Sequence, residues 1–497
     1  MSIWNVLIAT LLPLALRADN MVHCTDDGPF YFKFLPKSVG MLELGSPLKI
    51  SGLCFKTIEF ELKETPEAFE VVAMARDKRS WLCSDIFIIN HIRSPGAHLA
   101  FMSGSYRTAW PKAGMPEAEM QYIRSKGLKV LMSCAELKDW PKSLWMSIKT
   151  ILGGLGNNPH IPIFGSKNPE YQIEANREWV KGWTGHEYSR RADKLVHVDK
   201  RDIKSGTFMG IYRFDGLDNM INVASGSRLG HTTIAVWHED ELYVLESQDA
   251  WYWPTRSIQK TKWETWVRQA HDADFSVILL PLDDEHQALF DEQKAWDWFN
   301  HVAGLDYGFH NFVFGYTDTL NANWPEFIDI DFVMWGARLY EQIKPDDIRN
   351  VLTNAFNMRL GTNASILDEI IDELINRGMT YQELFAIVEK EGWQYPNGVN
   401  YVCSAFVTSV YRRAGLFGDL DINSTEFTPK DVYELNFFDT TGSKVPKGCK
   451  DFAPFGYCQI MGKIQLDLGE MNYVEPYAHM NEKCPTVAPE FKHIEGC

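Results

Sequence analysis

The distribution of the nine cysteines constrains this 497-residue chain more than any other feature. Four lie early and four lie late, while Cys403 stands alone between the two groups. In an oxidising compartment eight cysteines can pair and one is left as a free thiol. We therefore expect each group to pair within itself, with the connectivity open. The two groups are Cys24, Cys54, Cys83 and Cys134, and Cys449, Cys458, Cys484 and Cys497.

The beginning of the chain points to an exported protein. Residues 3–16 are almost entirely apolar and lead into Arg17 and Ala18. Such a run is too short to cross a bilayer but suits the core of a signal peptide. We expect residues 1–18 to be a signal peptide, with a buried N-terminal helix as the alternative. The sequons at Asn363 and Asn423 agree with a secreted protein or one of the lysosomal or endosomal lumen.

Charge and hydropathy limit the kinds of partner that the protein is expected to bind. The formal net charge is −17, and a strongly acidic chain repels phosphate backbones and anionic lipid surfaces. We therefore expect no nucleic-acid partner. Beyond the first residues, no segment reads as long and apolar enough for a membrane span, so we also expect no stable membrane insertion. Neither a metal nor a cofactor is expected.

The residue pattern divides the chain into a β-rich part and a mixed part, which predicts an α+β protein. Residues 19–150 carry short strand-like runs, such as 58–62 and 69–73, broken by glycine and proline, and we expect a β-rich, disulfide-braced domain there. A strand is also expected at 30–34. The stretch 151–194 begins with many glycines, prolines and asparagines and is expected to be a linker.

Residues 195–441 combine strands with a long helical stretch. The periodicity predicts strands at 231–237, 242–247 and 275–282. It predicts helices over 284–303, 327–358, 367–377 and 381–391, and a last helix over 402–414 that Gly415 closes. Residues 442–497, which hold the late cysteines, are expected to be an irregular extension stapled by disulfides.

The lone Cys403 lies at the start of the last predicted helix. Unpaired backbone N–H groups and the helix dipole stabilise a thiolate there, and a nearby imidazolium lowers the thiol pKa further. The same N–H groups can hold an oxyanion. This position favours a catalytic nucleophile, and the alternative is a buried structural thiol.

The candidate base is His231, which opens a strand after a loop of small residues. If residues 238–241 form a four-residue hairpin loop, Trp237 pairs with Leu242 and Thr233 with Glu246. His231 and Glu246 then lie on one face of the sheet, where a carboxylate can orient the imidazole.

Other residues compete for these two roles. His238 and His310 are the alternatives to His231 as the base. Asp249 is the alternative to Glu246 as the orienting carboxylate.

Three short motifs resemble those of a known family. Residues 230–236 (GHTTIAV), 244–247 (VLES) and 401–404 (YVCS) resemble the permuted papain-fold hydrolases, which are NlpC-like enzymes related to bacterial YiiX. In this family the histidine and its polar partner precede the helix-borne cysteine. The resemblance covers residues 195–440. It implies a circularly permuted papain-like catalytic domain over 195–441, with a helical insertion and a triad of Cys403, His231 and Glu246.

The resemblance also implies an activity and a substrate class. We expect a cysteine hydrolase that cleaves an amide or peptide bond through a thioester, acting on a peptide, an N-acyl amide or a cell-wall-type substrate. The loop 306–311 resembles the one that borders the cleft, and Tyr307, Tyr401 and Ser404 are expected to contact the oxyanion or the substrate. The alternatives are a thiol acyltransferase or lipase acting on lipid esters, and a non-catalytic secreted binding glycoprotein.

Overall fold

The chain is a mixed α+β protein in the computed structural model, with three largely antiparallel sheets. Described here are residues 22–23, 35–81, 83–134, 138–145, 170–192, 195–214, 216–249, 256–314, 329–452, 456–478 and 480. The expected signal peptide, the expected strand at 30–34, and Cys24, Cys484 and Cys497 lie outside these residues. The chain separates into two compact units. The first comprises Met1–Leu144, Glu326–Gly336 and Ile371–Met379, and the second comprises Trp145–Pro325, Ala337–Ile370 and Thr380–Cys497.

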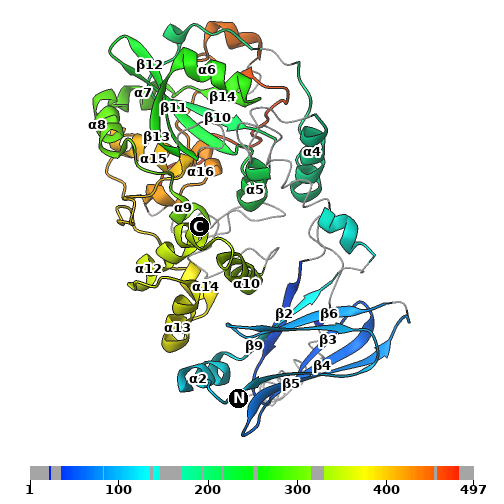
Figure 1. Ribbon diagram of the computed structural model, residues 1–497. Coiled ribbons are helices and arrows are strands. Elements are labelled where there is room, and N and C mark those ends of the chain that lie inside the picture. The colour runs from blue at the N-terminus through cyan, green and yellow to red at the C-terminus, as the bar shows by residue number, and fades with distance from the viewer. Residues whose placement is uncertain are drawn as a thin grey trace, which may run out of the picture. The chain divides into compact units, whose positions relative to one another are not determined.

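Two sheets of the first unit enclose a common apolar core (Figure 1). Their strand orders are β1-β3-β4-β5-β8 and β2-β9-β6-β7. Alternate residues of the long strands point inward, and Phe60 of one sheet meets Phe87 of the other edge to face, with ring centroids 5.0 Å apart. The strands are β1 (Val22–His23), β2 (Lys37–Leu42), β3 (Leu48–Ser51), β4 (Phe55–Glu64), β5 (Ala68–Lys78), β6 (Asp85–Asn90), β7 (Pro95–Ala100), β8 (Gly104–Pro111) and β9 (Leu128–Ser133).

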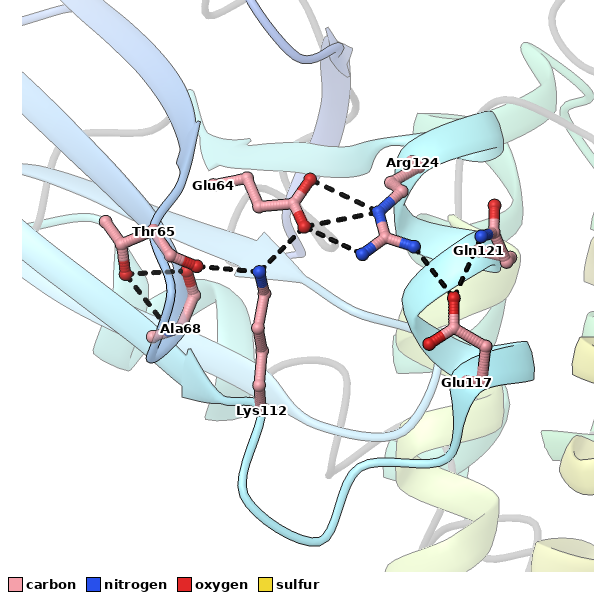
Figure 2. A network of polar contacts seen from close by, with 7 residues as sticks. All are labelled: Glu64, Thr65, Ala68, Lys112, Glu117, Gln121 and Arg124. Carbon is pink, nitrogen blue, oxygen red and sulfur yellow. Dashed lines mark hydrogen bonds and ion pairs between the residues drawn. The ribbon is translucent and has the colours of Figure 1, made fainter.

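Helix α2 (Glu117–Lys126) is tied to the end of β4 by charges. Figure 2 shows Glu64 between Arg124 and Lys112, with Nη2 of Arg124 and Nζ of Lys112 at 2.8 and 2.7 Å from Oε1. Hydrogen bonds from Arg124 and then Lys112 lower the pKa of Glu64 to about 2. The three charges lie near the surface, so their net contribution to stability is small.

A six-stranded antiparallel sheet forms the core of the second unit, in the order β13-β12-β11-β10-β14-β15 (Figure 1). Its central strands are buried along their whole length. Their inward residues pack against Trp263, Trp266 and Ala270 and against Val445 and Cys449 of the C-terminal part. The strands are β10 (Thr207–Tyr212), β11 (His231–His238), β12 (Glu241–Asp249), β13 (Arg256–Lys262), β14 (Ser276–Leu280) and β15 (Cys458–Met461).

Helices surround this sheet and fill the segment between β14 and Cys403. Parts of α10 and α13 group with the first unit. The α-helices described after β9 are α4 (Glu170–Thr184), α5 (Gly216–Ser225), α6 (Trp263–Asp272), α7 (Asp284–Leu289), α8 (Glu292–Val302), α9 (Phe309–Phe312), α10 (Ile330–Glu341), α11 (Pro345–Ile348), α12 (Asn354–Leu360), α13 (Leu367–Arg377), α14 (Tyr381–Phe385), α15 (Cys403–Ala414) and α16 (Pro429–Glu434).

Five expected elements differ from those in the structure. The helix expected over 284–303 is divided into α7 and α8, and the helix expected over 381–391 ends at Phe385. The helix expected over 327–358 is divided before Pro345, which cannot donate a backbone hydrogen bond inside a helix. The expected linker 151–194 contains α4, whose Trp179 is buried. The C-terminal extension is not irregular throughout, because β15 joins the sheet beside β14 with every residue buried.

The two disulfides between described cysteines lie within the two expected groups. Cys54 bonds Cys83 and Cys449 bonds Cys458, and Cys134 is also disulfide-bonded. Cys403 is a free thiol. None of the helices in the described part of the chain has both the length and the apolar character needed to cross a bilayer.

Candidate active site

His231 and Glu246 face each other across the hairpin of β11 and β12. Nε2 of His231 lies 3.2 Å from Oε2 of Glu246. The register pairs Trp237 with Leu242, as the sequence predicts, but the turn holds two residues instead of four, because His238 pairs with Glu241. The shorter turn leaves the register unchanged, so both side chains stay on the same face.

The Glu246 carboxylate is fully buried and is held by two further donors. Nε1 of Trp266 lies 3.2 Å from Oε1, and Nε2 of Gln248 lies 3.4 Å from Oε2. A buried carboxylate requires such partners, and these fix its position relative to the imidazole. Sequence reasoning missed both residues. Gln248 lies two residues after Glu246, which was a usable signal because alternate strand residues share a face.

Cys403 is the first residue of α15, and Val402 caps the helix in an extended conformation without a side-chain hydrogen bond. The helix contacts both β11 and β12 (Figure 1). In β12, Ser247 donates a 2.7 Å hydrogen bond to the carbonyl of Tyr401, two residues before the thiol. The start of α15 is thereby fastened to the strand that carries Glu246.

The thiol and the imidazole perturb each other's protonation. Cys403 and His231 share a hydrogen bond. Burial by itself would lower the pKa of His231, but the hydrogen bonds and charges of Cys403 and Glu246 outweigh it and raise that pKa to about 10. Burial would raise the pKa of Cys403, but the hydrogen bond and charge of His231, with the Thr232 backbone N–H, lower it. Both directions favour a thiolate–imidazolium pair.

Gly308 lets a neighbouring loop approach the segment before the thiol. Its N–H lies 3.2 Å from the carbonyl oxygen of Tyr401, and a Cβ added at Gly308 would come within 2.6 Å of the Tyr401 backbone. A side chain at this position would push the loop away from α15. The loop 306–311 therefore lies beside the segment that leads into Cys403.

Cys403 lines a small cavity that is partly open to solvent. The thiol residue is 3% exposed, and the cavity beside it measures about 20 Å³. Residues that line this cavity include Tyr307, Asn311, Cys403, Ser404, Thr425 and Thr428.

The three expected substrate contacts take different positions. Tyr307 and Ser404 line the Cys403 cavity, although the Ser404 hydroxyl donates to the carbonyl of Phe427 at 2.6 Å. Tyr401 instead lines a second cavity of about 680 Å³, where its hydroxyl lies 3.5 Å from Oε1 of Glu391. The structure thus does not bring the Tyr401 hydroxyl to the thiol.

The competing residues are engaged elsewhere. His238 is exposed beside the hairpin turn, with its ring against Trp296. His310 is buried, lies 3.1 Å from Oδ1 of Asn397 and stacks on Tyr395. Asp249 ends β12, and its side chain is outside the described part of the structure.

The two sequons differ in access, which predicts different glycosylation. Asn363 is exposed, whereas the Asn423 amide donates to the carbonyl of Glu389 and its Thr425 is buried. After expression in a secreting eukaryotic host, removal of N-glycans should lower the mass of the wild type but not of Asn363→Gln. Asn423→Gln should behave as the wild type, and loss of the mass change in that variant would contradict the prediction.

Cys403, His231 and Glu246 thus form a hydrogen-bonded row from one helix and two strands of the second unit. Comparisons of the chain with family models, with curated proteins and with solved structures found no match.

Proposed function

We propose that the protein is a cysteine hydrolase that cleaves an amide bond. The observation that carries this proposal is the row of hydrogen bonds from the thiol of Cys403 through the imidazole of His231 to the buried carboxylate of Glu246. A nucleophile, a base and an orienting group in contact are the requirements for covalent acyl transfer.

The chemistry follows from these positions. The Cys403 thiolate attacks the amide carbonyl, and the tetrahedral oxyanion is held by the uncapped backbone N–H groups at the start of α15. The imidazolium of His231 gives its proton to the leaving amine as the C–N bond breaks, which leaves a thioester. His231 then takes a proton from water, which attacks the thioester and releases the acid and the thiol.

The same arrangement supports a circularly permuted papain-like fold for the second unit. The histidine and carboxylate come from an antiparallel hairpin, and the cysteine comes from a helix later in the chain. The disulfides favour an oxidising compartment, which agrees with the proposed secreted or lysosomal location.

A thiol-directed activity probe tests the proposal. At pH 7 an iodoacetamide-type probe should label Cys403 much faster than it labels a small free thiol, because a thiolate is already present. Peptide mapping should place the label on Cys403, and Cys403→Ala should lose it. A thiol at that position no more reactive than glutathione would rule out the nucleophile and favour a binding protein.

A further inference from the structure

The side-chain amide of Asn311 lies at the site but is not used by the chemistry proposed above. Asn311 belongs to α9, is 1% exposed and lines the Cys403 cavity. Its Nδ2 donates a 2.5 Å hydrogen bond to the carbonyl of Thr425. This contact fixes the amide orientation, because only the NH₂ group can donate to a carbonyl.

The hydrogen bond to Thr425 uses Nδ2 of Asn311 and does not involve Oδ1. This oxygen is buried and has no hydrogen-bond partner among the described residues. A buried acceptor without a partner costs free energy, so such an atom calls for an explanation.

Three hydroxyls around the same cavity are already engaged with protein groups. Ser404 donates to the carbonyl of Phe427 at 2.6 Å, and Thr425 donates to Oδ1 of Asn423 at 2.7 Å. Thr428 donates to Oδ2 of Asp431 at 2.6 Å. Each of these hydroxyls already has a hydrogen-bond partner, whereas Oδ1 of Asn311 has none among the described residues, so it is the acceptor that gains most from the N–H of a ligand.

We infer that Oδ1 of Asn311 accepts a hydrogen bond from a substrate N–H next to the carbonyl that Cys403 attacks. An amide oxygen accepts and cannot donate, so it selects a substrate that brings a donor. A secondary amide carries that N–H, whereas the bridging oxygen of an ester has none. The inference rests on the proposed function and deepens it: the substrate class is a secondary amide, such as a peptide or an N-acyl amide, and Asn311 determines the specificity.

Two alkylating reagents of similar size isolate this contact. In both iodoacetamide and methyl iodoacetate, the thiolate forms a bond to the CH₂ carbon and iodide leaves, but only iodoacetamide has N–H groups. The measurement is the ratio of the two second-order rate constants at Cys403, each divided by the rate with glutathione. In Asn311→Leu this ratio should fall about 5- to 10-fold, the usual value of one such hydrogen bond.

Asn176→Leu is a matched control. Asn176 is also buried, its Nδ2 also donates at 2.5 Å to a backbone carbonyl (Phe214), and its Oδ1 also has no hydrogen-bond partner among the described residues. It does not line the Cys403 cavity. The variant removes the same contacts elsewhere in the second unit, so its rate ratio should equal that of the wild type.

One further reagent makes the test independent of whether Asn311→Leu folds. N,N-dimethyl iodoacetamide removes the N–H from the reagent, and the wild type should discriminate against it relative to glutathione by the same factor. If Cys403 is rapidly alkylated but neither the variant nor this reagent changes the ratio, the role of Asn311 is wrong while the proposed function stands. A Cys403 no more reactive than glutathione overturns both.

Discussion

Replacing Cys403 with alanine should reduce amide turnover by about 10⁶-fold, and His231→Ala should have nearly the same effect. Without Cys403 the covalent step is lost. Without His231, burial becomes the dominant influence on Cys403 and raises the thiol pKa, so little thiolate forms at neutral pH. The double variant should be little worse than either single one, because the two residues act as a unit.

Steady-state turnover of an amide substrate by the purified full chain measures this effect, with thermal melting as the check on folding. Ser409→Ala is a suitable control: Ser409 is a buried residue of the same helix, and its hydroxyl bonds the Phe406 carbonyl. This variant should keep most of the turnover. Full amide turnover by Cys403→Ala would show that the mechanism is wrong.

Glu246→Gln should lower turnover less, by roughly 10²- to 10⁴-fold, the range seen when the orienting carboxylate of a triad is neutralised. The substitution keeps the shape and retains an oxygen for the N–H of Trp266, but it removes the charge that stabilises the imidazolium. The pKa of His231, held at about 10 by Cys403 and Glu246 against the opposing effect of burial, should therefore fall.

The sign of the pH effect follows from the role of the imidazolium. Turnover declines at high pH as His231 loses the proton that the leaving amine needs, so a lower His231 pKa moves this alkaline limb to lower pH. Cys403 alkylation at pH 7 should also slow, because fewer molecules hold the thiolate–imidazolium pair. A pH–rate profile of Glu246→Gln that overlies that of the wild type would exclude the orienting role of Glu246.

Local pattern was enough to predict the elements on which the site is built. Alternation along residues 231–237 and 242–247 sets the faces of the hairpin, and the register places His231 and Glu246 together even though the turn is shorter than expected. The helix after Val402 ends at Gly415, which has the left-handed conformation expected of a C-cap. These features depend on residues that are close in the sequence, so they can be predicted without knowing the fold.

Contacts between distant segments could not be predicted from local pattern. Strand β15 (Cys458–Met461) is buried because it pairs with β14 at the edge of the sheet, and this pairing joins segments far apart in the sequence. Gly308 and Asn311 come to Cys403 from a loop about ninety residues earlier, which no spacing rule predicts.

Helix capping and strand alternation are local properties, so the order of residues is enough to predict a free thiol at a helix start and His231 on the same face as Glu246. Packing between distant segments brings Trp266 to the carboxylate and fastens the segment before α15 to Ser247. It also decides that the Tyr401 hydroxyl faces a different cavity from the thiol. These contacts depend on the fold because a buried polar group takes its partner from the segment that packs against it, and that packing depends on the whole core.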